Sequence, residues 1–244
     1  MIRRTLRYGP HRPNVADLWL PGGHLGEPER SPPPVVALLH GGSWGRPGSR
    51  RQLRRLAGDV VRHRWAAYTI EYRHHGRFGG GGWPSSFLDV AAALDHLASI
   101  DGVDAGRVAV CGYSAGAQLA LWAAGRLRLA SPAPGAAPAL RPVAAISLAG
   151  VLDRCPQGSP VALLPLGLPQ LLVHGLADRT VPAASSERYA EQALAVGDPV
   201  ELVTLRSLDH AAMLDPDRAA WQVTVARLGG WLGDHRPGGR PSGR

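Results

Sequence analysis

The chain has 244 residues, 45% of them hydrophobic and 19% charged, and a formal net charge of +8 at pH 7. This balance excludes a disordered chain and is typical of a globular protein long enough to bury a sizeable core. The two cysteines fit neither a disulfide framework nor a Cys/His metal-binding spacing. We expect neither a metal nor another cofactor.

The hydropathy of the chain predicts neither a secretory signal nor a membrane-spanning helix. The first ten residues, "MIRRTLRYGP", carry charge, but no apolar segment follows them, so they do not resemble a secretory signal. No apolar run approaches the roughly 20 residues that a membrane-spanning helix needs. We therefore expect a cytoplasmic protein without a membrane partner. The expected assembly is either a monomer or a homodimer.

The positive charge raises the question of nucleic-acid binding. All 27 basic residues are arginines, and the densest cluster is "RPGSRRQLRRL", residues 46–56. Such a run is more often the solvated face of a surface helix, and no aromatic residues alternate with it to stack on bases. We therefore expect a small-molecule partner and no nucleic acid.

Apolar runs bounded by glycine or proline alternate with segments of helical periodicity. We predict strands over residues 15–20, 35–39, 66–72, 107–112, 143–150, 170–175 and 200–205. We predict helices over residues 52–62, 83–99, 115–127, 185–195 and 216–232. This alternation predicts an α/β fold with a mostly parallel sheet covered by helices on both sides. We expect residues 1–235 to form one domain and residues 236–244 to be a flexible tail.

The pentapeptide Gly112-Tyr113-Ser114-Ala115-Gly116 lies between a predicted strand and a predicted helix. At that position a G-x-S-x-G pattern predicts a nucleophile elbow, a sharp turn whose small neighbours expose the serine hydroxyl above the sheet. The alternative is an ordinary glycine-rich turn, because the pattern alone is weak in a chain rich in glycine.

A serine hydroxyl becomes nucleophilic when a base takes its proton and an acid holds that base in one tautomer. Asp178 and His210 each follow a predicted strand, and together with Ser114 they give the chain order Ser, Asp, His of this architecture. We therefore predict a triad of Ser114, His210 and Asp178. Asp153, which also ends a strand, is the alternative acid.

Three other polar residues near the strand ends are expected to have structural roles. Asp209 adjoins His210 in sequence and is expected to be solvated or to bind loop backbone. His174 lies within the end of its strand and is expected to support the loop that follows. His40 is expected to buttress its own loop rather than to transfer protons.

The segment "HGGSWG", residues 40–45, follows the predicted strand over residues 35–39. Acyl transfer creates an oxyanion, and two fixed N–H donors are the strongest single aid to that chemistry. One donor comes from the residue after the nucleophile, here Ala115, and the other from the loop after an earlier strand. We predict that Gly42 and Ser43 supply the second donor. The two strand ends would then belong to one site.

These motifs resemble the α/β-hydrolase-fold esterases and lipases with an HGG-x-W element, and are similar to bacterial kynurenine formamidases and carboxylesterases. The segments that carry the resemblance run in order from about residue 35 to residue 231, and include "LLHGGSW", "IEYR", "GYSAGAQLALWAA", "PQLLVHGLADRTVP" and "SLDHAAMLDP". The resemblance implies the same triad. It also implies a short or absent cap, because relatives usually carry a longer insertion before "PQLLVHG".

Three aromatic residues are candidate substrate contacts. Trp44 resembles an aromatic residue beside the acyl pocket of that family, with packing under the loop as the alternative. Trp83 follows the glycine-rich "GRFGGGG" and is either a wall of the pocket or part of a turn that delivers Pro84 to its helix. Tyr113 stands where relatives often carry histidine.

The expected function is a serine hydrolase that cleaves a small carboxylic ester or amide through an acyl-enzyme. One alternative is an aryl formamidase acting on N-formylkynurenine-like substrates. The other is a non-catalytic, hydrolase-like binding protein.

Overall fold

The computed structural model describes residues 1–22, 31–42, 48–75 and 79–233. Its centre is one eight-stranded sheet with the strand order β1-β2-β4-β3-β5-β6-β7-β8. The strands are β1 (Ile2–Arg7), β2 (Val15–Leu20), β3 (Pro34–Leu39), β4 (Ala66–Ile70), β5 (Asp104–Tyr113), β6 (Ala144–Leu148), β7 (Gln170–Gly175) and β8 (Val200–Leu205).

The six neighbouring strands β4, β3, β5, β6, β7 and β8 are all parallel. In contrast, β1 pairs antiparallel with β2, and β2 pairs antiparallel with β4. The predicted α/β fold with a mostly parallel sheet is therefore confirmed. In a parallel sheet the carboxyl ends of the strands meet at one edge, which is where ligands bind in such folds. That edge holds the candidate site.

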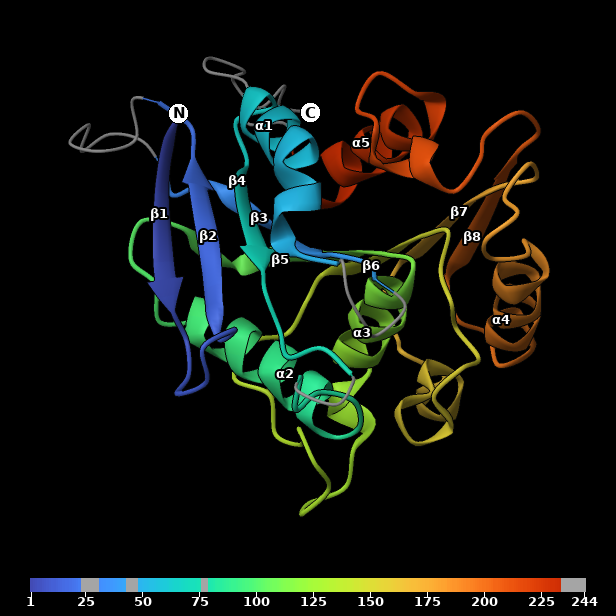
Figure 1. Ribbon diagram of the computed structural model, residues 1–244, viewed down its shortest axis with the longest axis horizontal. Helices are drawn as coiled ribbons and strands as arrows, with labels where there is room; N and C mark the ends of the chain where they lie inside the picture. Colours follow the sequence, from blue (N-terminus) through green and yellow to red (C-terminus); the bar gives the residue numbers. More distant parts are fainter. Residues whose placement is uncertain (23–30, 43–47, 76–78, 234–244) are drawn as a thin grey trace, which may run out of the picture.

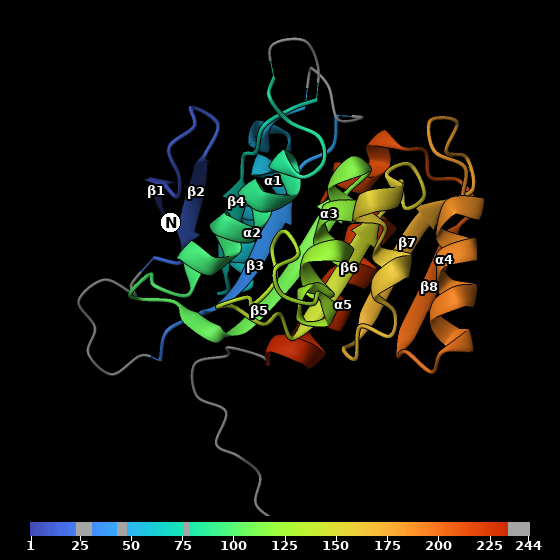
Figure 2. The same ribbon diagram turned by 90° about the horizontal axis from the view of Figure 1, so that it is seen from below.

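Five α-helices of the described residues cover the sheet, on both of its faces (Figures 1 and 2). They are α1 (Arg54–Arg62), α2 (Ser85–Leu97), α3 (Ala115–Ala124), α4 (Ala184–Ala195) and α5 (Ala219–Leu232). Helices α1 and α5 pack on one face with one apolar cluster, and α2, α3 and α4 pack on the other face with a second cluster. The central strands are buried on both faces, which explains why β3, β4, β6 and β7 are continuous apolar runs.

Short 3₁₀ helices occupy the connections, at Arg50–Leu53, Arg126–Arg128, Pro156–Gly158, Pro160–Leu163 and Ala211–Leu214. The connection from β6 to β7 is described throughout and contains only two of these, so no cap domain stands over the sheet there. In the described part of the chain, no helix is both long and apolar enough to cross a membrane.

The main error of the sequence prediction is the missing first strand, β1. Three of its six residues are arginines and most of the strand is exposed, so it lacks the apolar alternation that predicts a strand. The last helix begins at Ala219, three residues later than predicted, and α3 ends at Ala124 before a turn of 3₁₀ helix. The predicted flexible tail lies outside the described residues.

Candidate active site

Ser114 stands on the sharp turn between β5 and α3. Its backbone has φ 54° and ψ −119°, a conformation that residues other than glycine rarely adopt. Three backbone hydrogen bonds hold it: its N–H donates to Leu148, and its carbonyl accepts from Ala117 and Val151. The turn also needs Gly116, since a Cβ there would lie 2.4 Å from the carbonyl oxygen of His40. The predicted elbow geometry is thus present.

His210 and Asp178 reach Ser114 from the loops after β8 and β7. The Nε2 atom of His210 lies 3.0 Å from Oγ of Ser114, and its Nδ1 atom lies 2.6 Å from Oδ2 of Asp178. The backbone N–H of Ala177 donates to the carbonyl of Leu208, which ties the two loops together. The structure therefore brings together the three residues predicted to form a triad.

The carboxylate of Asp178 is fully buried but well supplied with donors. Burial raises its pKa, but backbone N–H groups of Val181 and Thr180 and the ring of His210 outweigh that effect, so its pKa is lowered from the usual value. A carboxylate accepts only, so Nδ1 of His210 carries the proton in this contact. The Nε2 atom is then the acceptor that faces the hydroxyl of Ser114.

His174 supports the same loop, as expected. It is fully buried, and its Nε2 atom lies 3.0 Å from the carbonyl oxygen of Val181 and 3.4 Å from Oδ2 of Asp178. Its Nδ1 atom lies 2.8 Å from Oγ of Ser186. Burial lowers the pKa of His174, so the ring is neutral and contributes hydrogen bonds rather than charge.

The remaining acidic candidates do not contact His210 through their side chains. Asp153 forms an ion pair of 2.5 Å with Arg188, and both side chains are about half exposed. Asp209 accepts a hydrogen bond of 2.9 Å from the backbone N–H of Ala212, which matches its expected role in the loop. Among Asp153, Asp178 and Asp209, it is Asp178 whose carboxylate contacts the ring of His210.

The predicted oxyanion donors lie partly within the described residues. Ala115 is the first residue of α3, whose first N–H groups have no partner within the helix and point outward from its end. Gly42 has φ 136°, which a residue with a side chain rarely adopts. Its neighbour Gly41 packs on the elbow, since a Cβ there would lie 3.0 Å from Cβ of Ser114. Ser43 and Trp44 lie outside the described residues.

Tyr113 and Trp83 occupy different surroundings. The ring of Tyr113 is buried and lies with its centroid 4.9 Å from that of His210, so it packs on the ring that faces Ser114. Burial and the nearby carboxylates raise the pKa of Tyr113 to about 12. Trp83 is half-buried and packs edge-on against Phe87 and Trp122, at 5.0 and 6.3 Å between centroids.

Three pockets open near these residues. One, of about 290 Å³, is lined by Ala115, Val151 and Val181 among others. A second, of about 330 Å³, is lined by Trp83, Phe87 and Cys155 among others, and Arg154 lines both of these pockets. A third, of about 540 Å³, is lined by His210, Asp209 and Thr180 among others. No group of three potential metal ligands occurs among the residues that the structure describes.

The sequence alone indicates no role for a largely buried polar cluster beneath the HGG segment. It consists of Glu71 and Tyr72, directly after β4, and Arg50. The signal was the tetrapeptide "IEYR", whose charged residues end an otherwise buried strand. Its contacts can only be identified once β3 and β4 are known to be neighbours.

Three kinds of comparison with known proteins bear on this site. The BD-FAE family model matches residues 23–129. An acetyl-hydrolase of Streptomyces hygroscopicus is 35% identical over 126 residues, which is 50% of this chain and 40% of that relative. The match therefore spans less than half the length of the curated relative.

Solved structures of esterases match almost the whole chain. A thermophilic esterase of Thermogutta terrifontis, Est2 with butyrate bound, is 21% identical with a TM-score of 0.78, covering 97% of this chain and 96% of that one. A truncated carbohydrate esterase from gut microbiota is 15% identical with a TM-score of 0.79, covering 95% and 96%. At this level of sequence identity, the structural similarity shows a shared fold and nothing further. Together with the eight-stranded sheet, it shows that the chain has the α/β-hydrolase fold.

Proposed function

We propose that this protein is a serine hydrolase that cleaves small carboxylic esters through an acyl-enzyme. The observation that carries the proposal is the hydrogen-bonded series Ser114, His210 and Asp178 at a strained strand-to-helix turn. A serine with this backbone and this pair of partners meets the geometric requirements for nucleophilic catalysis.

In the proposed reaction, Oγ of Ser114 attacks the acyl carbon while Nε2 of His210 takes its proton. Asp178 orients the ring and stabilises the imidazolium that forms. The tetrahedral intermediate collapses as His210 gives the proton to the alcohol, which leaves. A water molecule then attacks the acyl-enzyme with His210 again as base, releasing the carboxylic acid and restoring the serine.

The oxyanion of each intermediate is stabilised, in this proposal, by the backbone N–H groups of Ala115 and Gly42, with Ser43 as a further candidate. Donors of this kind act best when they are fixed before the reaction begins. The tight packing of Gly41 on Ser114 and of Gly116 on His40 supports such a fixed arrangement.

The substrate is proposed to carry a short acyl group. The pocket that includes Ala115 has a volume of about 290 Å³, which lies at the small end of the range for ligand pockets. Similarity to an acetyl-hydrolase and to an esterase with butyrate bound supports the same choice. Trp83 and Trp44 remain candidate walls, and Tyr113 is proposed to act mainly through its contact with His210.

The test is hydrolysis of p-nitrophenyl butyrate by the wild type and by Ser114→Ala. The wild type should turn over, and the variant should lose about 10⁴-fold or more in kcat while remaining folded. A parallel assay with N-formylkynurenine separates the formamidase alternative, which predicts a higher kcat/KM for that substrate. A folded wild type that hydrolyses neither compound would contradict the proposal and favour a binding protein.

A further inference from the structure

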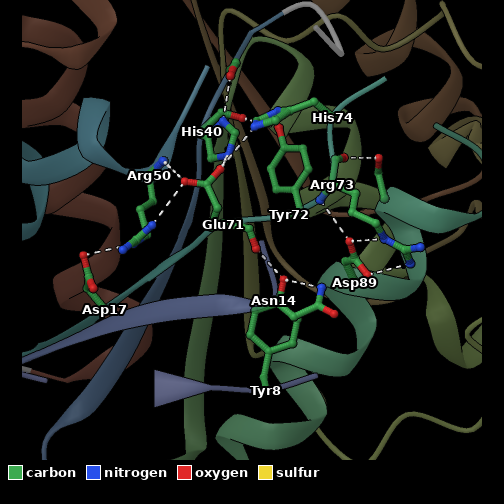
Figure 3. Close-up of polar contacts among 12 residues, drawn as sticks. Tyr8, Asn14, Asp17, His40, Arg50, Glu71, Tyr72, Arg73, His74 and Asp89 are labelled. Carbon is green, nitrogen blue, oxygen red and sulfur yellow. Dashed lines mark hydrogen bonds and ion pairs between the residues drawn. The ribbon is translucent and has the colours of Figure 1, made fainter. Parts of the chain in front are cut away.

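The polar cluster of Glu71, Tyr72 and Arg50 lies at the carboxyl ends of β3 and β4, directly beneath the HGG segment (Figure 3). These strands are parallel neighbours, and Leu39 pairs with Ile70. The next residues, His40 and Glu71, therefore leave the sheet side by side. Both are buried, His40 completely.

The carboxylate of Glu71 contacts the first residue of the HGG segment, His40, and a residue that follows the segment, Arg50. Its Oε1 atom lies 2.9 Å from Nε2 of His40. Its Oε2 atom accepts hydrogen bonds from the backbone N–H of Arg50 at 3.1 Å and from Nη1 of the same residue at 3.3 Å. Arg50 is also held by Asp17 on β2, at 3.1 Å (Figure 3). One carboxylate thus joins residue 40 to residue 50.

Gly48, two residues before Arg50, packs directly against the HGG segment. A Cβ on Gly48 would lie 1.9 Å from the carbonyl oxygen of Gly41 and 2.8 Å from Cα of Gly42. The backbone of Gly41 and Gly42 is therefore packed against Gly48, so a change in the position of Gly48 would also move Gly42.

Tyr72 strengthens the entry side of the segment. Its hydroxyl donates a hydrogen bond of 2.7 Å to the carbonyl oxygen of His40, and the two rings stack with centroids 4.3 Å apart. The same carbonyl faces Gly116 of the elbow. A path of direct contacts therefore runs from Glu71 and Tyr72 through His40 to the turn that carries Ser114.

The geometry points to Glu71 as a positioning residue for the oxyanion donors. By holding His40 and Arg50, it places the backbone of Gly41 and Gly42 against Ser114. It does not touch the reacting atoms and acts only through the backbone. This inference rests on the proposed function, because it assigns a role within that same site.

An ionised carboxylate suits this role better than a neutral group. Burial raises the pKa of Glu71, but the contacts with His40, Arg50 and His74 outweigh it, so the pKa lies below the usual value. A negative charge can hold a ring nitrogen and a guanidinium at once, whereas an amide offers one accepting oxygen and a donor that faces one of them.

The test compares Glu71→Gln with Asp198→Asn. Asp198 is also a buried carboxylate that accepts backbone N–H groups, from Leu166 and Gly167, but it lies before β8, at the opposite edge of the sheet. With p-nitrophenyl butyrate, Glu71→Gln should lower kcat ten- to hundredfold and change KM less than threefold, because oxyanion donors act on the transition state. Asp198→Asn should lower kcat less than threefold.

A thionoester of the same acid gives a second readout. Sulfur accepts hydrogen bonds weakly, so its hydrolysis depends less on the oxyanion donors. Glu71→Gln should therefore lose at least five times more activity on the ester than on the thionoester. Equal losses on both, or a kcat matching that of Asp198→Asn, would overturn the positioning role while leaving the proposed hydrolase intact.

Hydrogen exchange tests the same role without turnover. The backbone amides of peptides that include residues 40–42 and 48–50 should exchange faster in Glu71→Gln than in the wild type. In Asp198→Asn their exchange rates should equal those of the wild type. If Glu71→Gln does not fold, Tyr72→Phe removes one hydrogen bond to His40 and should give a smaller change of the same kind. Unchanged exchange in the folded variant refutes the role even if the wild type proves inactive, an outcome that would separately refute the proposed function.

Discussion

The Nε2 atom of His210 lies 3.0 Å from Oγ of Ser114, although 96 residues separate them in the chain. The contact arises because β5 and β8 run parallel within one sheet, so the loops that follow them open at the same edge. We expect this contact to activate the hydroxyl of Ser114 as a nucleophile.

Replacing Asp178 by asparagine should lower kcat by about 10³- to 10⁴-fold, because the amide no longer fixes the proton on Nδ1 of His210. Asp153→Asn is the matched variant, since it removes the alternative acid together with its ion pair with Arg188. Its kcat should fall by less than tenfold. Steady-state kinetics of both variants decide between the two acids, and the reverse order of effects would assign the role to Asp153.

Removing the ring of Tyr113 should disturb His210, since the two rings are in contact. Tyr113→Ala is expected to lower kcat by about tenfold through lost packing. Tyr113→Phe keeps the ring and should retain the kcat of the wild type. Because burial raises the pKa of Tyr113 to about 12, the pH–rate profiles of Tyr113→Phe and the wild type should coincide up to pH 9. A loss in Tyr113→Phe would show that the hydroxyl matters.

The small pocket beside Ala115 predicts a preference for short acyl chains. Across p-nitrophenyl acetate, butyrate, hexanoate and octanoate, kcat/KM should be highest for the first two and should fall at least tenfold by octanoate. A value that rises steadily with chain length would place the acyl group elsewhere, in the pocket lined by Trp83.

The stability of the fold should depend on the ionisation of Glu71. Its pKa in the folded state is lowered from about 4.5, so its contribution is present above that pH and is lost as the pH falls through the lower, folded-state value. At pH 6 to 7, Glu71→Gln should reduce the free energy of unfolding by about 2 kcal/mol. Urea unfolding between pH 3 and 7 should show the difference from wild type narrowing at the acid end. A constant difference would mean that the charge contributes nothing.

Much of the fold could be predicted from the sequence because the central strands are buried on both faces. Strands β3 and β7 are continuous apolar runs, so their positions follow from hydropathy. β1 could not be predicted in the same way. It is held at the edge of the sheet by its pairing with β2, and three arginines hide it in the sequence.

The candidate site divides along similar lines. Ser114, Asp178 and His210 each follow a predictable strand, and chemistry selects them as partners. The role of Glu71 could not be predicted, because it depends on β3 and β4 being neighbours and on Arg50 returning to the same place. Such contacts are a property of the tertiary arrangement rather than of any local pattern.

The most direct test of whether Ser114 is activated is mass spectrometry of the wild type and Ser114→Ala after treatment with a fluorophosphonate. Such a probe labels a serine whose hydroxyl is activated by a neighbouring base. We predict one adduct per wild-type chain, located on the peptide that carries Ser114, and no adduct on the folded variant. A folded wild type that takes no label, or a variant that labels equally, would contradict the account.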